Sequence, residues 1–392
     1  MRFVGIDVGA ETHTIAVVDE EAHVLEPPTA VSEDAAGYAR LRAVVGPPGD
    51  VLIALEATGH YWQNLVAFLL AEGCPVALLN PLRMHHFAGE DLPRAKTDAI
   101  DALAIARFAA QKRPVGSRLP DPATQELREL VRFRDRVSQE LGDRVRQLHR
   151  VVDLGFPEFT RHVRTLDSSL ATAILARYPT AAAFRTVSAR ALANLRYDGR
   201  HAVGRTLARE LLAAAAVSVG RHHGPVYQQE VRCLCEDITT LRRRLRALGA
   251  DIERTLHDHE VGQLLTTIDG IGPQTAARLV AELGDPAEFR DAAALAAYVG
   301  VVPATHHSGK RRPLRAPLAP LGHARLRAAL WMPTLVAVQR NPWLHAFYQG
   351  LRARGKLPKV ALIAAMRKLL AAVYSVAKHR RPFIPQLREV RP

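Results

Sequence analysis

The first hundred residues alternate short apolar runs with amphipathic stretches, and this alternation restricts the fold more than any other feature of the chain. Helices are predicted at 34–45, at 61–71 and from about residue 97, and strands are predicted at FVGIDV, TIAVVD, VLIALEA and PVALLN. Strands separated by helices are typical of an α/β domain. A short glycine-containing turn joins the first two strands, which predicts an antiparallel hairpin, and the later units predict parallel additions to the sheet.

Two long helices are predicted after this domain. From Thr124 to Leu154 apolar residues recur at steps of three and four, interrupted by Arg134, and a cleaner heptad series runs from Val231 to Ile252. Helices with these periods can pair along their apolar faces. The sequence leaves open whether they pair within one chain or between chains. It predicts only short helices, without a functional signal, for residues 155–225.

The length and composition of the chain predict several folded domains. At 392 residues the chain is long for one core, and its 48% apolar content is ample for two or three. We expect an α/β domain at 1–115, a helical and coiled-coil region at 116–258 and a mainly α-helical domain at 259–392. No run of eighteen apolar residues occurs and charged residues come early, so we expect a cytoplasmic protein. The three cysteines indicate neither a disulfide framework nor a zinc site.

Positive charge is concentrated away from the N-terminus. The chain carries a net charge of +14, yet residues 1–110 contain 7 Lys and Arg against 15 Asp and Glu. Residues 305–392 contain 18 Lys and Arg and a single acid, Glu389. So basic a segment indicates a nucleic acid or an anionic membrane as partner. Nucleic acid is favoured, because the segment lacks the continuous basic amphipathic helix of a membrane-surface protein.

The segment LLTTIDGIGPQTAARLVAELGD, residues 264–285, predicts a helix–hairpin–helix motif. Gly270 and Gly272 would let the backbone turn tightly between two helices, leaving amide groups at the start of the second helix, near Thr275, free to hold a phosphate. The plainer alternative is an ordinary helical turn in which glycine ends the first helix.

Four acids occupy positions that suit a metal site. Asp7 and Glu56 end predicted strands, and Asp98 and Asp101 lie three apart on a predicted helix, which places both on one helical face. Carboxylate oxygens are the ligands that magnesium prefers, and metal ions assist phosphodiester chemistry. Each acid taken singly is more often a solvated charge or a cap, and Asp98 could cap its helix. Together they predict a divalent-metal site.

Ser308 lies beside Gly309 in a basic segment that predicts contact with phosphate. Cationic neighbours could activate a serine hydroxyl and stabilise charge during attack on a phosphodiester. From spacing alone, however, a Ser-Gly pair in a basic loop is more often a phosphate contact than a nucleophile. The candidate nucleic-acid-binding cations around it are Lys310, Arg311, Arg312, Arg315, Arg325 and Arg327.

Segments at both ends of the chain match the motifs of one known family. The N-terminal segments are GIDVGAETHTIAVVD, ALEATGHYW, NPLRMHHFA and AKTDAIDALAIARFA. The C-terminal segments are TIDGIGPQTAARLVAELGD, YVGVVPATHHSGK and FYQGLRARGKLPKVALIAAMRKLL. In both sets the chain resembles the insertion-sequence 110 family of transposases, which includes the Piv-like DNA invertases. The middle of the chain carries no match of this kind.

This resemblance implies an RNase H-like, RuvC-type domain whose four metal-binding acids are Asp7, Glu56, Asp98 and Asp101, with Mg²⁺ or Mn²⁺ as cofactor. It also implies that Ser308 is a nucleophile that attacks a DNA phosphodiester and leaves a phosphoserine intermediate. The partners implied are double-stranded DNA at the element ends and target, a structured noncoding guide RNA, and further copies of the chain in a dimer or tetramer.

The sequence departs from the family at one segment. Where family members have Ile-Ser-Lys-x-Gly, this chain reads PLAPLG, with Ala319 and Pro320 in place of the serine and lysine. Three alternatives therefore stay open: a RuvC-like endonuclease without a covalent intermediate, a degenerate DNA-binding protein, and an actin-like phosphotransferase. The last lacks a second glycine-rich phosphate loop and leaves the basic tail unexplained.

Overall fold

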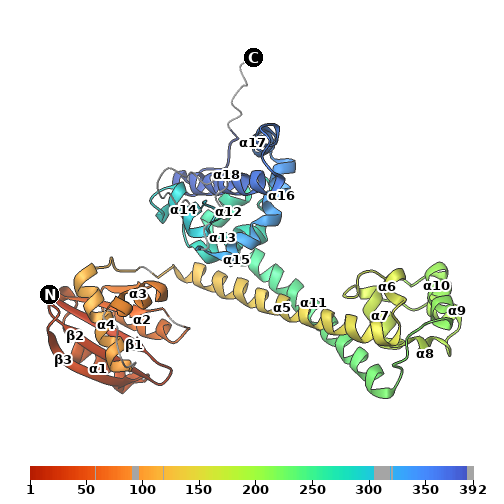
Figure 1. The fold of residues 1–392 in the computed structure, drawn as a ribbon, viewed down its shortest axis with the longest axis horizontal. Helices are drawn as coiled ribbons and strands as arrows, with labels where there is room; N and C mark the ends of the chain where they lie inside the picture. The colour runs from red at the N-terminus through yellow and green to blue at the C-terminus, as the bar shows by residue number, and fades with distance from the viewer. Residues whose placement is uncertain (58, 91–96, 118, 304–317, 319–320, 386–392) are drawn as a thin grey trace, which may run out of the picture. The chain divides into compact units, whose positions relative to one another are not determined.

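The structure is a computed structural model that describes the chain except residues 58, 91–96, 118, 304–317, 319–320 and 386–392. The chain divides into two compact units, Met1–Pro120 and Asp121–Pro392 (Figure 1).

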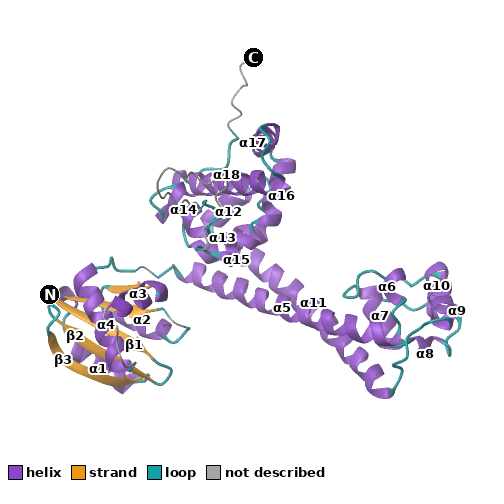
Figure 2. Ribbon diagram, viewed as in Figure 1, coloured by secondary structure: helices purple, strands orange, loops and turns teal. Residues whose placement is uncertain are grey.

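The first unit is built on one five-stranded mixed sheet (Figure 2). Its strands are β1 (Arg2–Val8), β2 (Thr12–Val18), β3 (Val24–Ser32), β4 (Val51–Glu56) and β5 (Val76–Leu79). The spatial order is β3-β2-β1-β4-β5; β1 pairs antiparallel with β2 and parallel with β4, and β5 adds parallel to β4. Both the antiparallel hairpin and the parallel additions predicted from the sequence are confirmed.

Each edge of this sheet has a feature that limits further strand pairing. β3, which the sequence pattern missed, is a largely exposed edge strand that contains Pro27 and Pro28. Proline has no amide hydrogen to give to a neighbouring strand, so it is tolerated at an edge. At the other edge, the Ser117 amide donates to the Val76 carbonyl at 2.7 Å, and the Leu78 amide donates to the Ser117 hydroxyl at 2.9 Å.

Helices cover both faces of the sheet. The helical segments are α1 (Ala35–Val45), η1 (Pro48–Asp50), α2 (Trp62–Ala71), α3 (Pro81–Glu90) and α4 (Asp98–Lys112). Helices α1 and α2 share a core with Val4, Ile6 and Ile53, whereas α4 shares the opposite core with Phe3 and Ala54. This mixed sheet, with its strand order and directions, is the RuvC-like, RNase H-like fold that the sequence predicted.

Side-chain caps fix where the helices of this unit begin. The Asp34 carboxylate accepts from the Gly37 amide at 2.7 Å and starts α1. The Thr97 hydroxyl accepts from the Ile100 amide at 3.3 Å and starts α4. The prediction that Asp98 could cap the helix is therefore wrong. Asp98 is the first residue of α4, and its side chain is exposed.

Two long helices, α5 (Pro122–Gly155) and α11 (Pro225–His257), pack against one another in the second unit. Val137, Leu241 and Leu248 lie buried between them, so these helices pair within one chain. A small helical subdomain joins their far ends around a core that contains Phe156, Phe159 and Phe184. Its helices are α6 (Phe159–His162), α7 (Ser169–Arg177), α8 (Ala181–Phe184), α9 (Ala189–Ala193) and α10 (Arg205–Ala216).

The C-terminal part of the second unit is a helical domain packed on the start of α5 and the end of α11. Its elements are α12 (Glu260–Thr266), α13 (Pro273–Leu283), η2 (Pro286–Glu288), α14 (Ala292–Val299), α15 (Ala324–Ala329), α16 (Trp331–Arg340), α17 (Pro342–Ala353) and α18 (Pro358–His379). The mainly α-helical character predicted for this region is confirmed.

Helix α18 is the one described helix that is long and apolar enough to cross a membrane, with a mean hydropathy of 1.7 over its most apolar stretch. Ala365, Met366 and Leu369 on this helix are fully buried in the C-terminal core, and 56% of that stretch is buried. The core helix of a folded domain meets the same length and composition criterion.

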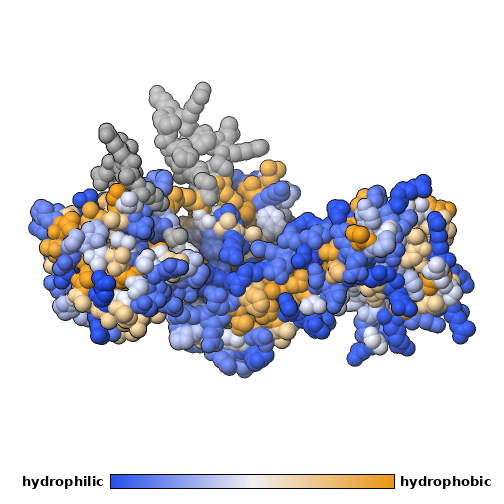
Figure 3. Space-filling model, turned by 90° about the horizontal axis from the view of Figure 1, so that it is seen from below, coloured by the Kyte–Doolittle hydropathy of each residue, from blue (hydrophilic) through white to orange (hydrophobic). Residues whose placement is uncertain are grey.

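Hydrophilic residues cover much of the face that Figure 3 shows, with hydrophobic residues interspersed among them.

Candidate active site

Two of the predicted metal ligands lie on neighbouring parallel strands and on the same face of the sheet. Ile6 of β1 is in register with Leu55 of β4, so Asp7 and Glu56 are the next residues along the two strands. Alternation along β1 places Asp7 on the face occupied by Phe3, and alternation along β4 places Glu56 on the face occupied by Ala54. Both carboxylates therefore lie on the side covered by α4, at the carboxyl ends of their strands.

Helix α4 brings the other two acids to the same end of the sheet. It runs antiparallel to β1: the Arg113 guanidinium at its C-terminal end lies 5.9 Å from the centre of the Phe3 ring, at the beginning of the strand. Its first turn consequently lies toward Asp7. Asp98 and Asp101 share a helical face with Ala102, which is buried against the sheet. Asp101, like Asp7 and Glu56, is partly buried, whereas Asp98 is exposed.

Gly5 allows α4 to approach the sheet this closely. A Cβ atom at Gly5 would lie 2.2 Å from the backbone oxygen of Ala102 and 2.2 Å from the backbone nitrogen of Ala106. Real Cβ atoms never come so near, and neither backbone atom can move without moving the helix. Glycine at this position thus sets the distance between the acids of α4 and those of the strands.

We expect Gly5→Ala to destabilise the first unit by at least about 2 kcal/mol, because the added methyl group overpacks a backbone contact. Gly49→Ala is the matched control, since a Cβ there meets nothing within 4 Å. Trp62 can report on this unit alone once the other two of the three tryptophans, Trp331 and Trp343, are changed to phenylalanine. Equal urea midpoints for the two glycine variants would contradict this account of Gly5.

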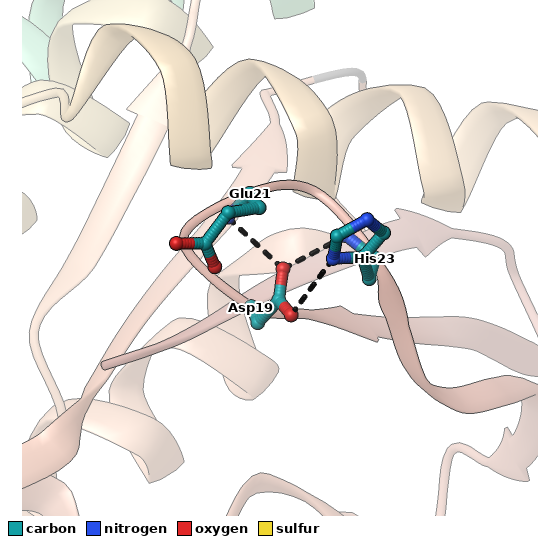
Figure 4. Close-up of side chains that lie close together, drawn as sticks. All are labelled: Asp19, Glu21 and His23. Atoms are coloured by element: carbon teal, nitrogen blue, oxygen red, sulfur yellow. Dashed lines mark hydrogen bonds and ion pairs between the residues drawn. The ribbon is translucent and has the colours of Figure 1, made fainter.

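A second acidic group, Asp19, Glu21 and His23, lies at the other end of the sheet (Figure 4). Asp19 follows β2, whose end pairs with the beginning of β1, away from Asp7. Its carboxylate accepts from the amides of Glu21 and His23 at 3.0 and 2.8 Å and pairs with the His23 ring at 3.3 Å. These bonds hold the turn between β2 and β3, and the group is distinct from the four predicted ligands.

A buried polar network holds the opposite face of the sheet. His13 is fully buried, and its Nε2 lies 2.5 Å from the Glu33 carboxylate, which also accepts from the Tyr38 hydroxyl at 2.8 Å. Burial would raise the pKa of Glu33, but the hydrogen bonds from His13, Tyr38 and Asn64 outweigh it and lower that pKa. The network ties β2 to α1 and α2 on the side away from Asp7.

The turn predicted as a helix–hairpin–helix joins α12 to α13. Gly270 has a φ of +99°, and a Cβ there would lie 2.5 Å from the Cβ of Ala337 on α16. Gly270 thus serves the packing of the turn against α16. Gly272, at the N-cap of α13, is open on its outer side, and Thr275 lies in the first turn of that helix. Phosphate binding by this turn stays a prediction.

The predicted nucleophile and its basic neighbours lie outside the described residues: Ser308, Lys310, Arg311, Arg312 and Arg315, together with Ala319 and Pro320. The structure does describe the residues that flank this segment, where Pro303 pairs with Leu318 in an antiparallel bridge. Arg327 donates to the carbonyl of Val299 at 3.2 Å and so caps the end of α14, while Arg325 is exposed. Arg327 therefore has a structural contact that the sequence prediction did not include.

His323, a few residues after this segment in the sequence, belongs to an ion network around the buried Glu282 that sequence reasoning missed. The His323 Nδ1 accepts from the Leu326 amide at 3.1 Å, so its Nε2 carries the hydrogen and donates to Glu282 at 3.2 Å. Arg132 of α5 lies 3.4 Å from the same carboxylate, whose side chain is only 5% exposed. Burial would raise the pKa of Glu282, but the hydrogen bond from His323 and the charge of Arg132 lower it to about 2.

This depressed pKa predicts a pH-dependent stability. The ionised Glu282 stabilises the second unit fully above its ordinary pKa of 4.5, and this contribution is lost as the pH falls toward about 2. We expect Glu282→Gln to lower the free energy of unfolding at pH 7 by on the order of 3 kcal/mol. The deficit should shrink between pH 5 and 3, measured by urea unfolding followed through Trp331 and Trp343 in a Trp62→Phe background.

Glu288→Gln, at an exposed acid of the same unit, is the control and should leave the unfolding free energy unchanged at every pH. If Glu282→Gln lowered the free energy of unfolding equally at pH 7 and pH 3, the stabilisation would come from the shape of the Glu282 side chain and not from its charge.

Two family models match the chain. One, described as "Transposase" and named for the DEDD domain of IS110 elements, matches residues 4–157. The other, described as "Transposase IS116/IS110/IS902 family", matches residues 262–349. The first match contains the four acids and the second contains Ser308.

The chain belongs to the IS110 family of transposases.

Full-length relatives agree with this assignment. The IS110 43.6 kDa protein of Streptomyces coelicolor is 28% identical over 96% of this chain and 94% of its own length. The pilin gene-inverting protein of Moraxella bovis is 27% identical over 86% of this chain and 83% of its own length. The putative transposase of the IS117 mini-circle of Streptomyces coelicolor is 26% identical over 98% of this chain.

Among solved structures, Thermus thermophilus RuvC in complex with a Holliday junction substrate aligns with 30% of this chain and 98% of its own, at 19% identity and a TM-score of 0.22. The RuvC-like fold of the first unit is established by its own strand order and directions. The family membership makes this chain an enzyme of the transposase and recombinase class.

Proposed function

We propose that this transposase cleaves and rejoins DNA at the ends of an insertion sequence and at its target, with Ser308 as nucleophile and a divalent metal site at Asp7, Glu56, Asp98 and Asp101. The observation that carries the proposal is that β1 and β4 end in Asp7 and Glu56 at the end of the sheet toward which the first turn of α4, with Asp98 and Asp101, is directed. The match of the second family model around Ser308 supports the nucleophile.

The four carboxylates fit a hard divalent cation such as Mg²⁺ or Mn²⁺. Their donor atoms are all oxygens, which are the ligands that such cations prefer. When bound, such a cation polarises a phosphate oxygen and stabilises charge on the attacking and leaving oxygens. Asp7 and Glu56 would hold it from the rigid sheet, and Asp101 and Asp98 from the helix that Gly5 holds against that sheet.

In the proposed reaction, the Ser308 hydroxyl loses its proton as its oxygen forms a bond to the phosphorus of a DNA phosphodiester. One DNA phosphorus–oxygen bond breaks, and the freed strand end leaves as a hydroxyl after taking up a proton. The phosphoserine keeps the energy of the bond, so the hydroxyl of another strand can attack it and release Ser308. Exchange of strands between two duplexes needs several such sites, which favours a dimer or tetramer.

The basic C-terminal segment is proposed to hold nucleic acid, both DNA and a structured noncoding RNA that selects donor and target. Its 18 Lys and Arg against one acid far exceed what a solvated surface needs. Gly272, Thr275, Lys310, Arg311, Arg312, Arg315 and Arg325 are the proposed contacts, with Gly270 and Arg327 supporting the backbone beside them. A DNA recombinase of this kind would act in the cytoplasm.

The metal site is tested by comparing Asp101→Asn with Asp19→Asn, the same change in the acidic group at the other end of the sheet. Mn²⁺ should raise the thermal midpoint of the wild type and of Asp19→Asn, but not of Asp101→Asn, because a ligand stabilises only the fold that binds it. DNA cleavage should fall at least about 100-fold in Asp101→Asn alone, since even outer-shell partners of a metal contribute about 10–100-fold.

An equal response to Mn²⁺ in Asp101→Asn and the wild type would remove Asp101 from the site. A loss of the response in Asp19→Asn alone would move the metal to the turn between β2 and β3.

The serine is tested by incubating the protein with Mn²⁺, labelled element-end DNA and RNA transcribed from the flanking sequence, then denaturing it and looking for attached label. We expect a covalent adduct with the wild type and none with Ser308→Ala, because the hydroxyl oxygen forms the bond to phosphorus. Cleavage without an adduct would instead identify a RuvC-like endonuclease that uses water. Binding without cleavage in the wild type would identify a degenerate DNA-binding protein.

A further inference from the structure

A cleft of about 320 Å³ opens between α5, α11, α13, α15 and α16 in the second unit. Arg134, Arg278, Gln274 and Thr275 form its polar wall, and Met332 and Pro333 are among the residues of its apolar wall. This volume is far more than the roughly 15 Å³ that one water molecule requires. None of the acids proposed to bind metal is among the residues that line this cleft.

Arg134 lines this cleft, and among the residues that the structure describes its guanidinium makes no ion pair. Its Nε is shielded by the protein and has no hydrogen-bond partner, so the terminal nitrogens are the groups through which it would meet a ligand. Five other arginines of α5 have acceptors, and the exposed Arg136 lies over the Phe133 ring. The five pairs are Arg128 with the Ala281 carbonyl, Arg132 with Glu282, Arg144 with Asp237, Arg146 with Asp143 and Arg150 with Glu230. A guanidinium that lines a cleft and has no acceptor is available to an anion such as a phosphate, which it can bind through two parallel hydrogen bonds.

The remaining polar groups of the cleft also favour an anion. Arg278 adds a second guanidinium, oriented by an ion pair with Asp135. Thr275 lies in the first turn of α13, where amide groups give a helix a positive end, and its hydroxyl has no hydrogen bond within the described part of the chain. Gln274 is already engaged, donating to the Gly249 carbonyl at 2.9 Å. Among the described residues, the groups of this cleft without any hydrogen-bond partner given are therefore the guanidinium of Arg134 and the hydroxyl of Thr275, and Arg278 adds the N–H groups that its ion pair with Asp135 leaves over.

We propose that this cleft binds one backbone phosphate of a polynucleotide, with Arg134 and Thr275 donating hydrogen bonds to its oxygens. The inference rests on the proposed function, since it assumes that the chain acts on nucleic acid. The apolar wall distinguishes a polynucleotide from a small free anion: Met332 is 62% exposed and, with Pro333, offers a surface for the sugar beside the phosphate. A bare inorganic ion would leave that wall uncovered.

The test compares Arg134→Met with Arg146→Met, which removes the same charge from an exposed position farther along the same helix. Affinity is measured for labelled duplex DNA and for a structured RNA at several salt concentrations. Arg134→Met should weaken binding about tenfold near 0.15 M salt and reduce the slope of log affinity against log salt by about one, irrespective of base sequence. Arg146→Met should leave both quantities unchanged. Thr275→Val should weaken binding but leave the slope of log affinity against log salt unchanged, because the hydroxyl that it removes carries no charge.

Thermal unfolding serves as the control for folding, and Arg134→Met should be at least as stable as the wild type, because it removes a desolvated donor that lacks an acceptor. An unchanged salt slope in Arg134→Met, with wild-type binding intact, would overturn the inference and leave the proposed function standing. An inability of the wild-type protein to bind either nucleic acid would overturn the proposed function, and the inference with it.

A third arm adds inorganic phosphate alone. If it stabilised the wild type but not Arg134→Met, while nucleic-acid binding was the same in both proteins, the cleft would be a site for a free anion and the polynucleotide inference would be wrong. An Arg134-dependent slope with DNA, with RNA, or with both would identify which polynucleotide supplies the phosphate.

Discussion

The contact between α4 and β1 at Gly5 is the constraint on which the candidate active site depends. Two acids belong to the sheet and two to the helix, so their separation is set by how closely the helix can lie. The absence of a side chain at Gly5 lets the helix backbone rest on the strand itself. On the far face, the buried His13 pairs with the partly exposed Glu33, which also accepts from Tyr38 and so ties the sheet to α1.

Much of this arrangement could be predicted from local sequence patterns. The apolar runs of β1, β2, β4 and β5 and the periodicities of the long helices identified these elements, because each buries a regular face. β3 escaped prediction because most of its residues are exposed and two are prolines, so it carries neither alternation nor strand propensity. The sequence offered Asp98 as a cap of α4, and the hydrogen bond from the Ile100 amide to the Thr97 hydroxyl shows that the cap is the residue before it.

The second unit shows where local patterns stop being informative. Glu282, His323 and Arg132 meet although 41 residues separate the first two and 150 the first and third. Nothing in the neighbourhood of Glu282 predicts burial of its charge. Arg134 appeared in the sequence only as an interruption of an apolar stripe, and its importance emerges once α13 and α16 close a cleft around it. Gly270, predicted as a phosphate-binding residue, proves to pack against Ala337.

The treatment of the sheet edges limits how copies of this protein can associate. One edge ends in a strand whose Pro27 and Pro28 lack amide hydrogens, and the other is covered where Ser117 bonds to β5. These features reduce the number of groups with which a strand from a neighbouring molecule could pair. Enzymes that gather several copies on DNA are exposed to high local concentrations, at which open sheet edges promote aggregation. In the dimer or tetramer proposed above, contacts through helical surfaces would avoid these edges, and side chains there would determine which partner fits and in what orientation.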